Sequence, residues 1–282
     1  MNRLQQIEFE MLKEFVRICE ELNLRYYLVC GSALGAAKYG GFIPWDDDID
    51  VGMPRKDYNI FCEKAQALLP PHLFLQNSST DKSYPLFFSK IRHNGTTYIE
   101  KSYSKTNMNH GIYIDVFPLD GYPADAKLQQ KLEKEKLRYN LTRLCCLNIK
   151  RTWKTALLVA FQKLLCVHKH PERFVKRLES VISGYSTEGS DVWCNHGNWQ
   201  GKLEYAPKEQ YGKGAMVSFE GLTVRIPEKY DEYLTQKYGD WRADLPEDQK
   251  VGHHHYEICD VDNPYTIYVK ILANGKILIV NK

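Results

Sequence analysis

The sequence predicts an α/β protein in which a mixed sheet is flanked by helices and interrupted by a basic, all-helical insert. In the first 123 residues, short apolar runs such as 26–30 and 111–117 end at glycine or proline, and amphipathic helical stretches separate them. Residues 124–184 show helical periodicity throughout, and short strand-like runs return in residues 185–282. A chain of 282 residues is long enough to bury a full core.

The first predicted elements surround a glycine-rich stretch. Apolar residues recur every three or four positions over residues 4–22, which predicts an amphipathic helix. Residues 26–30 predict a buried strand that ends at Gly31-Ser32. The small residues that follow predict a short helix over 33–37, and Gly40-Gly41 ends it.

The remaining elements are predicted from the same apolar periods and from turn-forming residues. They are a strand over 47–53; a helix that Pro54 opens; strands over 87–92 and 96–100 joined by a hairpin turn at His93-Asn94-Gly95; a strand over 111–117 ended by Pro118; strands over 216–219 and 222–226 joined at Glu220-Gly221; a helix over 230–238; and a hairpin over 266–280 turned at Asn274-Gly275.

The insert is strongly basic, although the whole chain has a formal net charge of only +3. Residues 127–177 contain fourteen Lys or Arg and three Glu, which leaves about −8 for the rest of the chain. The module favours a polyanionic or anionic-membrane partner, and we expect no nucleic acid partner. An ordinary helical subdomain whose lysines face water explains the composition equally well. The cations that flank its apolar clusters, which include Trp153 and Phe161, are Arg143, Lys150, Arg151, Lys154 and Lys163.

The sequence predicts neither export nor a membrane span. Met1 leads into a charged amphipathic segment rather than a signal peptide, and no apolar run approaches the roughly 20 residues that span a bilayer. The eight cysteines lack the spacing of a disulfide framework, and several lie in apolar periodic runs, as reduced core thiols do. We expect a cytoplasmic protein, peripheral at the inner face of the membrane if the insert docks there.

Two carboxylates alternate with apolar residues in the stretch Asp48-Ile49-Asp50-Val51. On a β-strand this alternation places Asp48 and Asp50 on one face and turns Asp47 to the other. Adjacent carboxylates repel each other at neutral pH unless a cation lies between them, and oxygen ligands favour Mg²⁺ or Mn²⁺. The pattern therefore predicts a divalent metal site, with a solvated acidic turn as the simplest alternative.

A third carboxylate, Asp115, lies among the apolar residues of 111–117. It either caps the turn at Pro118 or faces the other two carboxylates, where a cation offsets the cost of burying it. Upstream, Gly31 and Ser32 allow backbone amides and a hydroxyl to approach a phosphate closely. Carboxylates on neighbouring strands after such a turn are typical of metal-assisted phosphoryl chemistry. Asp48, Asp50 and Asp115 are therefore the candidate metal ligands and catalytic residues.

The stretch from Gly31 to Pro54 resembles the signature of the LicD family. These are transferases with a nucleotidyltransferase-like fold, and they include bacterial phosphorylcholine transferases and the fukutin-related group. The resemblance continues through Lys90-Ile91-Arg92, residues 95–96, 110–120, 219–221, 238–240 and 253–256. The first motif is long and specific, the C-terminal pieces are individually weak, and the insert resembles the family least.

The resemblance implies transfer of a phospho-alcohol from a CDP-linked donor to a sugar hydroxyl, with CMP as the leaving group. It matches Asp48, Asp50 and Asp115 to the family's metal-binding carboxylates, with Mg²⁺ or Mn²⁺ as cofactor, and Gly31-Ser32 to its phosphate-contacting turn. The favoured donor is CDP-choline, and the favoured acceptor is a lipid-linked precursor of a cell-surface glycan of the teichoic acid or lipopolysaccharide type. CDP-ribitol or CDP-glycerol as donor, and true nucleotidyl transfer, are the alternatives.

The pattern of predicted elements divides the chain into three parts, with an all-helical insert over residues 124–184 between two α/β portions. The resemblance implies that residues 1–123 are a nucleotidyltransferase-like core and that the C-terminal part over 185–282 completes the catalytic domain.

Five further residues are candidate substrate contacts. Lys90 and Arg92 have the spacing to share one strand face, where they meet the diphosphate or form a solvated pair. His254 belongs to a run of three histidines, one or two of which we expect to bond phosphate. Lys38 and Trp45 lie within the first motif. Aromatic residues that suit the quaternary ammonium of choline are Trp45, Tyr113 and Trp199.

Overall fold

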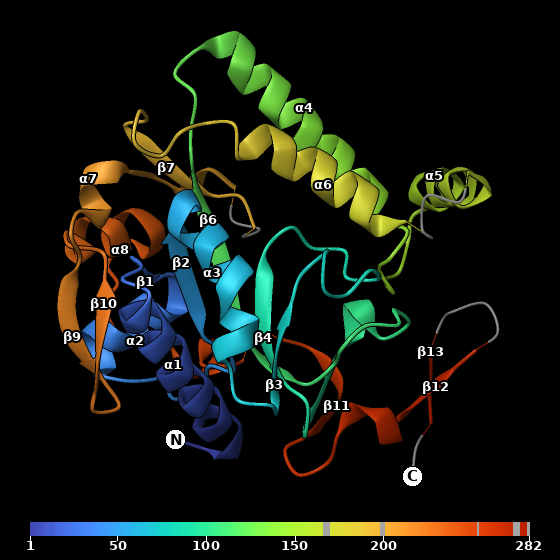
Figure 1. Cartoon of the computed structure of the whole chain (residues 1–282), viewed down its shortest axis with the longest axis horizontal. Coiled ribbons are helices and arrows are strands. Elements are labelled where there is room, and N and C mark those ends of the chain that lie inside the picture. Colours follow the sequence, from blue (N-terminus) through green and yellow to red (C-terminus); the bar gives the residue numbers. More distant parts are fainter. Residues whose placement is uncertain (166–169, 198–200, 253, 273–276, 281–282) are drawn as a thin grey trace.

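A mixed seven-stranded sheet forms the centre of the computed structural model, which describes residues 1–165, 170–197, 201–252, 254–272 and 277–280 (Figure 1). The strand order is β1-β2-β6-β4-β3, and β7 and β8 extend the sheet from β6. Strands β2 and β6 are parallel, whereas the other neighbours are antiparallel. The strands are β1 (Tyr27–Leu28), β2 (Asp50–Pro54), β3 (Leu73–Gln76), β4 (Ser89–His93), β6 (Ile112–Gly121), β7 (Val192–Asn195) and β8 (Tyr205–Pro207).

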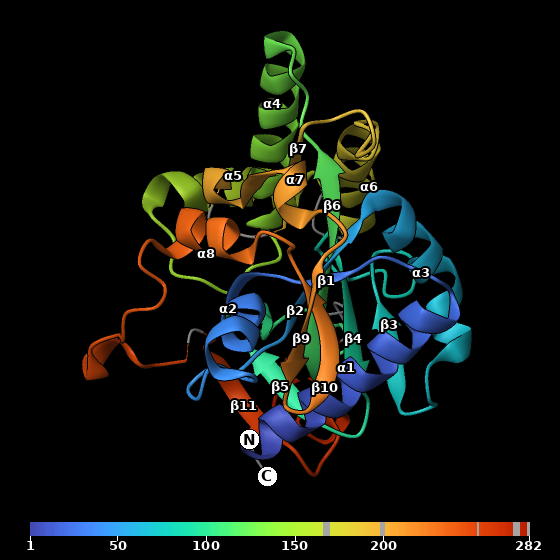
Figure 2. The same ribbon diagram turned by 90° about the vertical axis from the view of Figure 1, so that its left-hand side faces the viewer.

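Helices cover both faces of this sheet, which confirms the predicted α/β fold class. In Figure 2, α1 and α3 lie on one side of the sheet and α2 and α8 on the other. The first pair shares an aromatic contact, because the ring centroids of Phe15 and Phe61 are 5.1 Å apart in the core. The helices of this part are α1 (Arg3–Glu21), α2 (Cys30–Tyr39), α3 (Arg55–Leu68), α7 (Lys208–Tyr211) and α8 (Tyr230–Tyr238).

Local sequence signals set the ends of the first two helices. Asn2 and Gln5 form a reciprocal capping box at the start of α1, which satisfies two backbone N–H groups. Gly40 ends α2 in the left-handed conformation, with φ of +67°, where a glycine has no Cβ penalty. Helix α2 begins at Cys30, so Gly31 and Ser32 lie in its first turn and not, as predicted, in a turn before it.

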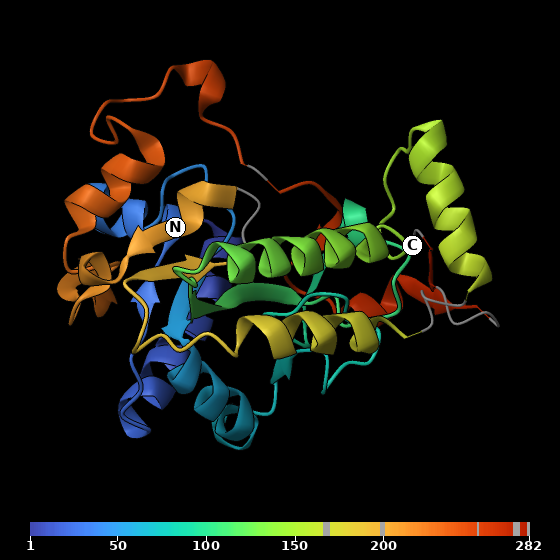
Figure 3. The same ribbon diagram turned by 90° about the horizontal axis from the view of Figure 1, so that it is seen from above.

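The insert consists of α4 (Ala126–Arg143), α5 (Trp153–Leu164) and α6 (Pro171–Ile182). Helices α4 and α6 lie side by side, as Figures 1 and 3 show. They share an apolar cluster with Phe87, which lies two residues before the start of β4. Helix α5 stands apart from this pair. The predicted helices are thus present, whereas the division of the chain into three parts remains a prediction.

Three two-stranded units complete the fold. They are β9 (Ala215–Phe219) with β10 (Leu222–Ile226), β5 (Thr97–Glu100) with β11 (Tyr256–Asp260), and β12 (Val269–Ile271) with β13 (Ile277–Ile279). The turn predicted at Asn274-Gly275 lies outside the described residues. Pairing of β11 with β5 brings the C-terminal part of the chain back to the central sheet, and it places His254 next to the acidic residues of the motif.

The predicted hairpin of residues 87–100 is wrong in its pairing. Both strands form, with a turn at Asn94-Gly95, but β4 bonds to β3 and β6 whereas β5 bonds to β11. An Asn-Gly turn permits pairing of its flanking strands, and here β4 pairs instead with β3 and with the longer β6 of the central sheet.

Pro118 does not end β6, contrary to the prediction. On one edge of β6, β4 pairs as far as Val116 and β7 pairs from Leu119 onward. Pro118 therefore lies between the two antiparallel partners, where the missing N–H disturbs neither ladder.

Candidate active site

The three predicted carboxylates lie together at the start of β2 and in β6. Parallel pairing places Asp50 opposite Asp115, and the backbone N–H of Asp115 donates to the Ile49 carbonyl at 2.8 Å. Burial raises the pKa of Asp50 well above its usual range, and the charges of Asp48 and Asp115 raise it further. The pKa values of Asp48 and Asp115 are raised as well, in both cases by burial first. Such a cluster attracts a cation.

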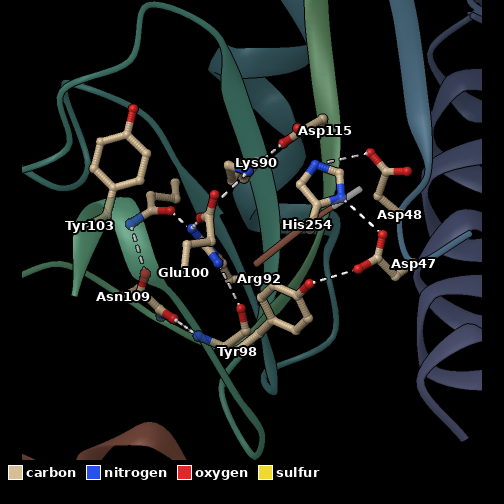
Figure 4. Close-up of polar contacts among 12 residues, drawn as sticks. Asp47, Asp48, Lys90, Arg92, Tyr98, Glu100, Tyr103, Asn109, Asp115 and His254 are labelled. Carbon is tan, nitrogen blue, oxygen red and sulfur yellow. Dashed lines mark hydrogen bonds and ion pairs between the residues drawn. The ribbon is translucent and has the colours of Figure 1, made fainter. Parts of the chain in front are cut away.

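His254 lies between two of the acidic residues (Figure 4). Its Nδ1 is 3.0 Å from Asp47 Oδ1 and its Nε2 is 3.7 Å from Asp48 Oδ2. Burial alone lowers the pKa of His254, but the hydrogen bond to Asp47 and the charges of Asp48 and Asp47 raise it to about 10. A protonated imidazole therefore stands where the carboxylates require positive charge.

The residues around His254 fit a divalent cation. Asp47, Asp48 and His254 each offer a ligand atom, and these atoms lie within 4.8 Å of one another. Two carboxylates and an imidazole that has lost its proton are donors that divalent metals accept, so a cation bound here would displace the proton of His254. The predicted ligand set shares only Asp48 with this group.

The expectation that Asp47 points away from Asp48 and Asp50 is wrong. Residues 46–49 precede β2, which begins only at Asp50, so the alternation of a strand does not apply to them. Tyr98 donates a hydrogen bond to Asp47 Oδ2 at 3.0 Å. Burial alone raises the pKa of Asp47, but the bonds to His254 and Tyr98 outweigh it and lower the pKa. Asp47 is thus a member of the acidic site.

Lys90 supplies the positive charge at the other end of the cluster. Its Nζ lies 2.9 Å from Asp115 Oδ1, 3.8 Å from Glu100 Oε2 and 3.2 Å from the centroid of the Tyr113 ring. Burial alone raises the pKa of Glu100, but Lys90 and Arg92 outweigh it and lower the pKa. Lys90 thus links β4 to the carboxylate of β6 (Figure 4).

Arg92 shares the face of Lys90, as predicted, but it is fully buried. Its guanidinium donates to Gln76 Oε1 and to the Gly111 carbonyl, both at 2.8 Å, and lies 3.4 Å from Glu100 Oε2. In this structure Arg92 holds Glu100, which in turn faces Lys90, so its position is a supporting one behind the site.

The first turn of α2 supports the carboxylates directly. Ser32 Oγ accepts a hydrogen bond of 2.8 Å from the backbone N–H of Asp50, which ties α2 to β2. A Cβ atom at Gly31 would lie 2.8 Å from Asp46 Oδ2, so only glycine allows this carboxylate to lie against the helix. Both residues therefore stand at the site, and contact with a phosphate remains a prediction for each.

Lys38 and Trp45 lie further along the same motif. Lys38 Nζ donates to the Ala243 carbonyl at 2.6 Å and is 3.3 Å from Asp244, so it ties α2 to the segment after α8. The Trp45 ring lies edge-on to Tyr39, with centroids 6.2 Å apart. Tyr113 is buried beneath Lys90, whereas His253 and Trp199 lie outside the described residues.

Three further acids belong to this site and are not among the predicted site residues: Glu8, Asp46 and Glu100. Burial and the charges of Asp48, Asp47 and Asp46 raise the pKa of Glu8 well above its usual range. Burial and the charges of Asp48 and Asp47 raise the pKa of Asp46 to about 7. The sequence could have indicated Glu8, because it falls on the apolar stripe of α1, where a charged side chain is unusual and suggests a functional role. The sequence contains no comparable indication for Glu100, since its approach to Lys90 depends on the packing of β5.

A cavity of about 330 Å³ adjoins the acidic site. Its lining residues are Glu100, Lys101, Ser102, Asn148, Ile149, His254 and His255. A larger cavity of about 700 Å³ runs along α1 between Arg3 and Glu14, and its described lining contains none of the predicted site residues.

The mixed sheet and its acidic, cation-attracting site fit the class of transferases with a nucleotidyltransferase-like fold. Residues 23–138 match the family described as LicD/FKTN/FKRP, nucleotidyltransferase domain. The chain is also 30% identical over 262 residues to the lipopolysaccharide cholinephosphotransferase LicD of Haemophilus influenzae, a match that covers 90% of this chain and 96% of that protein. The chain therefore belongs to the LicD family and is a phosphotransferase.

A shorter match reaches a second activity in the family. Over 48 residues the chain is 44% identical to the ribitol 5-phosphate transferase FKRP of Mus musculus and to that of Homo sapiens. These matches cover 17% of this chain and 10% of each FKRP protein.

Proposed function

We propose that this chain transfers phosphocholine from CDP-choline to a sugar hydroxyl of a cell-surface glycan precursor, of the teichoic acid or lipopolysaccharide type, and releases CMP. The observation that carries the proposal is the match along 96% of a lipopolysaccharide cholinephosphotransferase, together with an acidic site in which His254 lies between Asp47 and Asp48. In the reaction, the acceptor oxygen bonds to the phosphorus that bears choline, and the bond from that phosphorus to the CMP oxygen breaks.

Asp47, Asp48, Asp50 and Asp115 would hold the cofactor, which we propose is Mg²⁺ or Mn²⁺. When bound, such an ion neutralises the charge of the diphosphate. Lys90 is the cation of this chain that lies beside Asp115, and it would orient a phosphate oxygen through its ammonium group. A carboxylate of this cluster would accept the proton of the acceptor hydroxyl, because an alcohol is a weak nucleophile until it loses that proton.

The 330 Å³ cavity is our candidate for the acceptor site. Its volume is at the lower end of the range for small-ligand sites, and it opens beside His254. Glu100, Ser102 and Asn148 line it with groups that bond sugar hydroxyls.

The described cysteines form no disulfides, in keeping with a cytoplasmic site of action.

A ribitol donor is the second candidate, and the match to the FKRP proteins favours it. CDP-ribitol or CDP-glycerol would use the same acidic site and also release CMP. A true nucleotidyltransferase would instead attack the inner phosphorus and leave the nucleotide on the acceptor.

Incubation of the purified chain with CDP-choline, CDP-ribitol or CDP-glycerol, with Mg²⁺ or Mn²⁺, tests these alternatives. We expect CMP release from CDP-choline, and we expect Asp48→Asn and Asp50→Asn each to lower it at least about 100-fold. Asp125→Asn is the matched control, because Asp125 caps α4 on the insert and Asn caps equally well.

Each outcome of this assay has a definite meaning. CMP release from CDP-ribitol alone would replace the proposed donor, and nucleotide bound to the acceptor would overturn phospho-alcohol transfer. Full activity of the Asp48→Asn, Asp50→Asn double variant would overturn the assignment of the acidic site.

A further inference from the structure

Helix α5 exposes its large apolar side chains and buries a polar one. Trp153, Leu157, Phe161 and Leu164 are between 59% and 78% exposed, although they are spaced by four, four and three residues and so share one face. The opposite face packs inward through Val159 and Gln162, and Gln162 Oε1 accepts a hydrogen bond of 2.9 Å from Cys145 Sγ. A helix that packs on the core of its own chain has the opposite arrangement, with its apolar face buried and its polar face exposed.

The charge around α5 complements an anionic surface. Between Glu135 and Glu172 the sequence contains eight Lys or Arg and no acidic residue. Lys154 lies beside the exposed apolar face, with its Nζ 5.5 Å from the centroid of a Trp153 ring. Basic residues next to an exposed aromatic and aliphatic stripe are the features of helices that lie in the interface of an anionic membrane.

A second exposed apolar unit lies on the same side of the molecule. Figures 1 and 3 both place the β12–β13 hairpin at the side where α5 projects. Ile271 and Leu278 of this hairpin are at least half exposed. Residues 263–282 contain three lysines and no acidic residue. The two segments come from distant parts of the sequence and share the same combination of apolar exposure and positive charge.

We propose that the exposed face of α5, assisted by the β12–β13 hairpin, docks on an anionic phospholipid bilayer. The contact is interfacial: no helix of the described residues is both long and apolar enough to cross a membrane. Four large apolar side chains on one helix face supply hydrophobic contact, and the surrounding cations supply the preference for negative headgroups.

Docking through α5 would also set the orientation of the active site. The cavity beside His254 is bounded by Asn148 and Ile149, which lie just before α5 in the chain. The Asn148 N–H donates to the Ser102 carbonyl at 2.6 Å, so this segment is fastened to the catalytic part. A lipid-linked sugar would thus enter the cavity from the side of the membrane, an extension that rests on the proposed function.

Co-sedimentation with vesicles tests the docking without any substrate. The vesicles contain phosphatidylcholine with about 30% phosphatidylglycerol, at about 0.15 M salt, and vesicles of phosphatidylcholine alone serve for comparison. We expect binding to the anionic vesicles, with a blue shift of tryptophan fluorescence that the Trp153→Ser, Phe161→Ser double variant lacks, and about tenfold weaker binding of that variant. Met216→Ser is the control, because Met216 is 55% exposed on β9, far from α5 in Figure 1.

Three results would overturn the proposal: no binding of the unaltered chain to anionic vesicles, equal binding of the double variant, or equal loss in the Met216→Ser control. A dimer in light scattering that the double variant converts to a monomer, without vesicle binding, would assign the face to a second copy instead. The rate of CMP release in solution without vesicles is the control for folding. Equal rates for the double variant and the unaltered chain would show that the variant is correctly folded. If donor cleavage fails while vesicle binding persists, the proposed function falls and the docking surface stands.

Discussion

Two buried aspartates should respond in opposite directions to the same substitution. Asp50 lies among other carboxylates, and burial together with Asp48 and Asp115 raises its pKa. Asp120 is fully buried as well, but the Arg55 guanidinium donates two hydrogen bonds of 2.7 Å to its two oxygens. We expect Asp50→Asn to stabilise the metal-free protein and Asp120→Asn to destabilise it.

The pKa of an unfolded aspartate limits how much stability Asp50→Asn can add. An aspartate whose pKa is raised on folding does not change the free energy of unfolding at pH values below its unfolded pKa of about 3.9. Above that pH it lowers the free energy of unfolding by about 1.4 kcal/mol for each pH unit, until the group ionises in the folded state. At pH 7 the limit is about 4 kcal/mol, and the charge of His254 reduces it. Because Asn carries no proton, the advantage of Asp50→Asn grows as the pH rises from about 4 to 7.

The cost at Asp120 comes from the partner it leaves behind. Loss of one member of a buried ion pair typically costs about 3–5 kcal/mol, since the other charge stays buried without compensation. For a chain of this size one kcal/mol shifts Tm by about 2–4 °C. We expect Asp120→Asn to lower Tm by roughly 6–20 °C and Asp50→Asn to raise it by roughly 2–8 °C.

Calorimetry in EDTA at pH 7 and near pH 4 measures both variants. The Asp50→Asn gain should be present at pH 7 and nearly absent near pH 4, and excess Mg²⁺ should reverse its sign by stabilising only the unaltered site. If Asp50→Asn lowers Tm in EDTA as much as Asp120→Asn does, the carboxylates are not in repulsive contact and our reasoning about the acidic site is wrong.

Three further changes test the supports of the site. Gly35→Ala places a Cβ 2.5 Å from the Gly41 carbonyl oxygen, a backbone atom that can move only if the chain shifts. We therefore expect the free energy of unfolding in urea to fall by about 1–3 kcal/mol, and an unchanged midpoint would contradict this expectation. Ser32→Ala leaves the buried Asp50 N–H without its acceptor and should cost about 1–3 kcal/mol, whereas Ser32→Thr keeps the hydroxyl and should cost less. His110 is buried, and burial lowers its pKa to about 4, so stability falls between about pH 6.5 and 4 by up to roughly 3 kcal/mol. His110→Gln should flatten this decline, and an unchanged pH profile would show that other groups cause it.

Most of the element order was predictable because it depends on short-range patterns. The period of α1, the left-handed Gly40 and the β9–β10 hairpin are encoded by residues within a few positions of one another. The errors concern pairing and strand continuation. The partner of β4 and the passage of β6 through Pro118 depend on strands far along the chain, which a local pattern does not contain.

The same division applies to the acidic site. The alternation in Asp48-Ile49-Asp50 and the lone acid of the 111–117 strand identified three carboxylates, and β2–β6 pairing brings Asp50 and Asp115 opposite each other. The role of Asp47 was misjudged, because the strand begins only at Asp50. The burial of Arg92 was also out of reach, since its partners come from three other segments of the chain.

The sequence by itself determined the family, the α/β class, the acidic motif and the basic insert, because each is written in neighbouring residues or in composition. Only the tertiary structure decided that His254 lies between Asp47 and Asp48, 207 and 206 residues away in the chain, and that Lys90 faces Asp115. It also decided that α5 turns its apolar face outward. Periodicity defines which residues share a face, whereas the direction of that face depends on what the rest of the chain places against it.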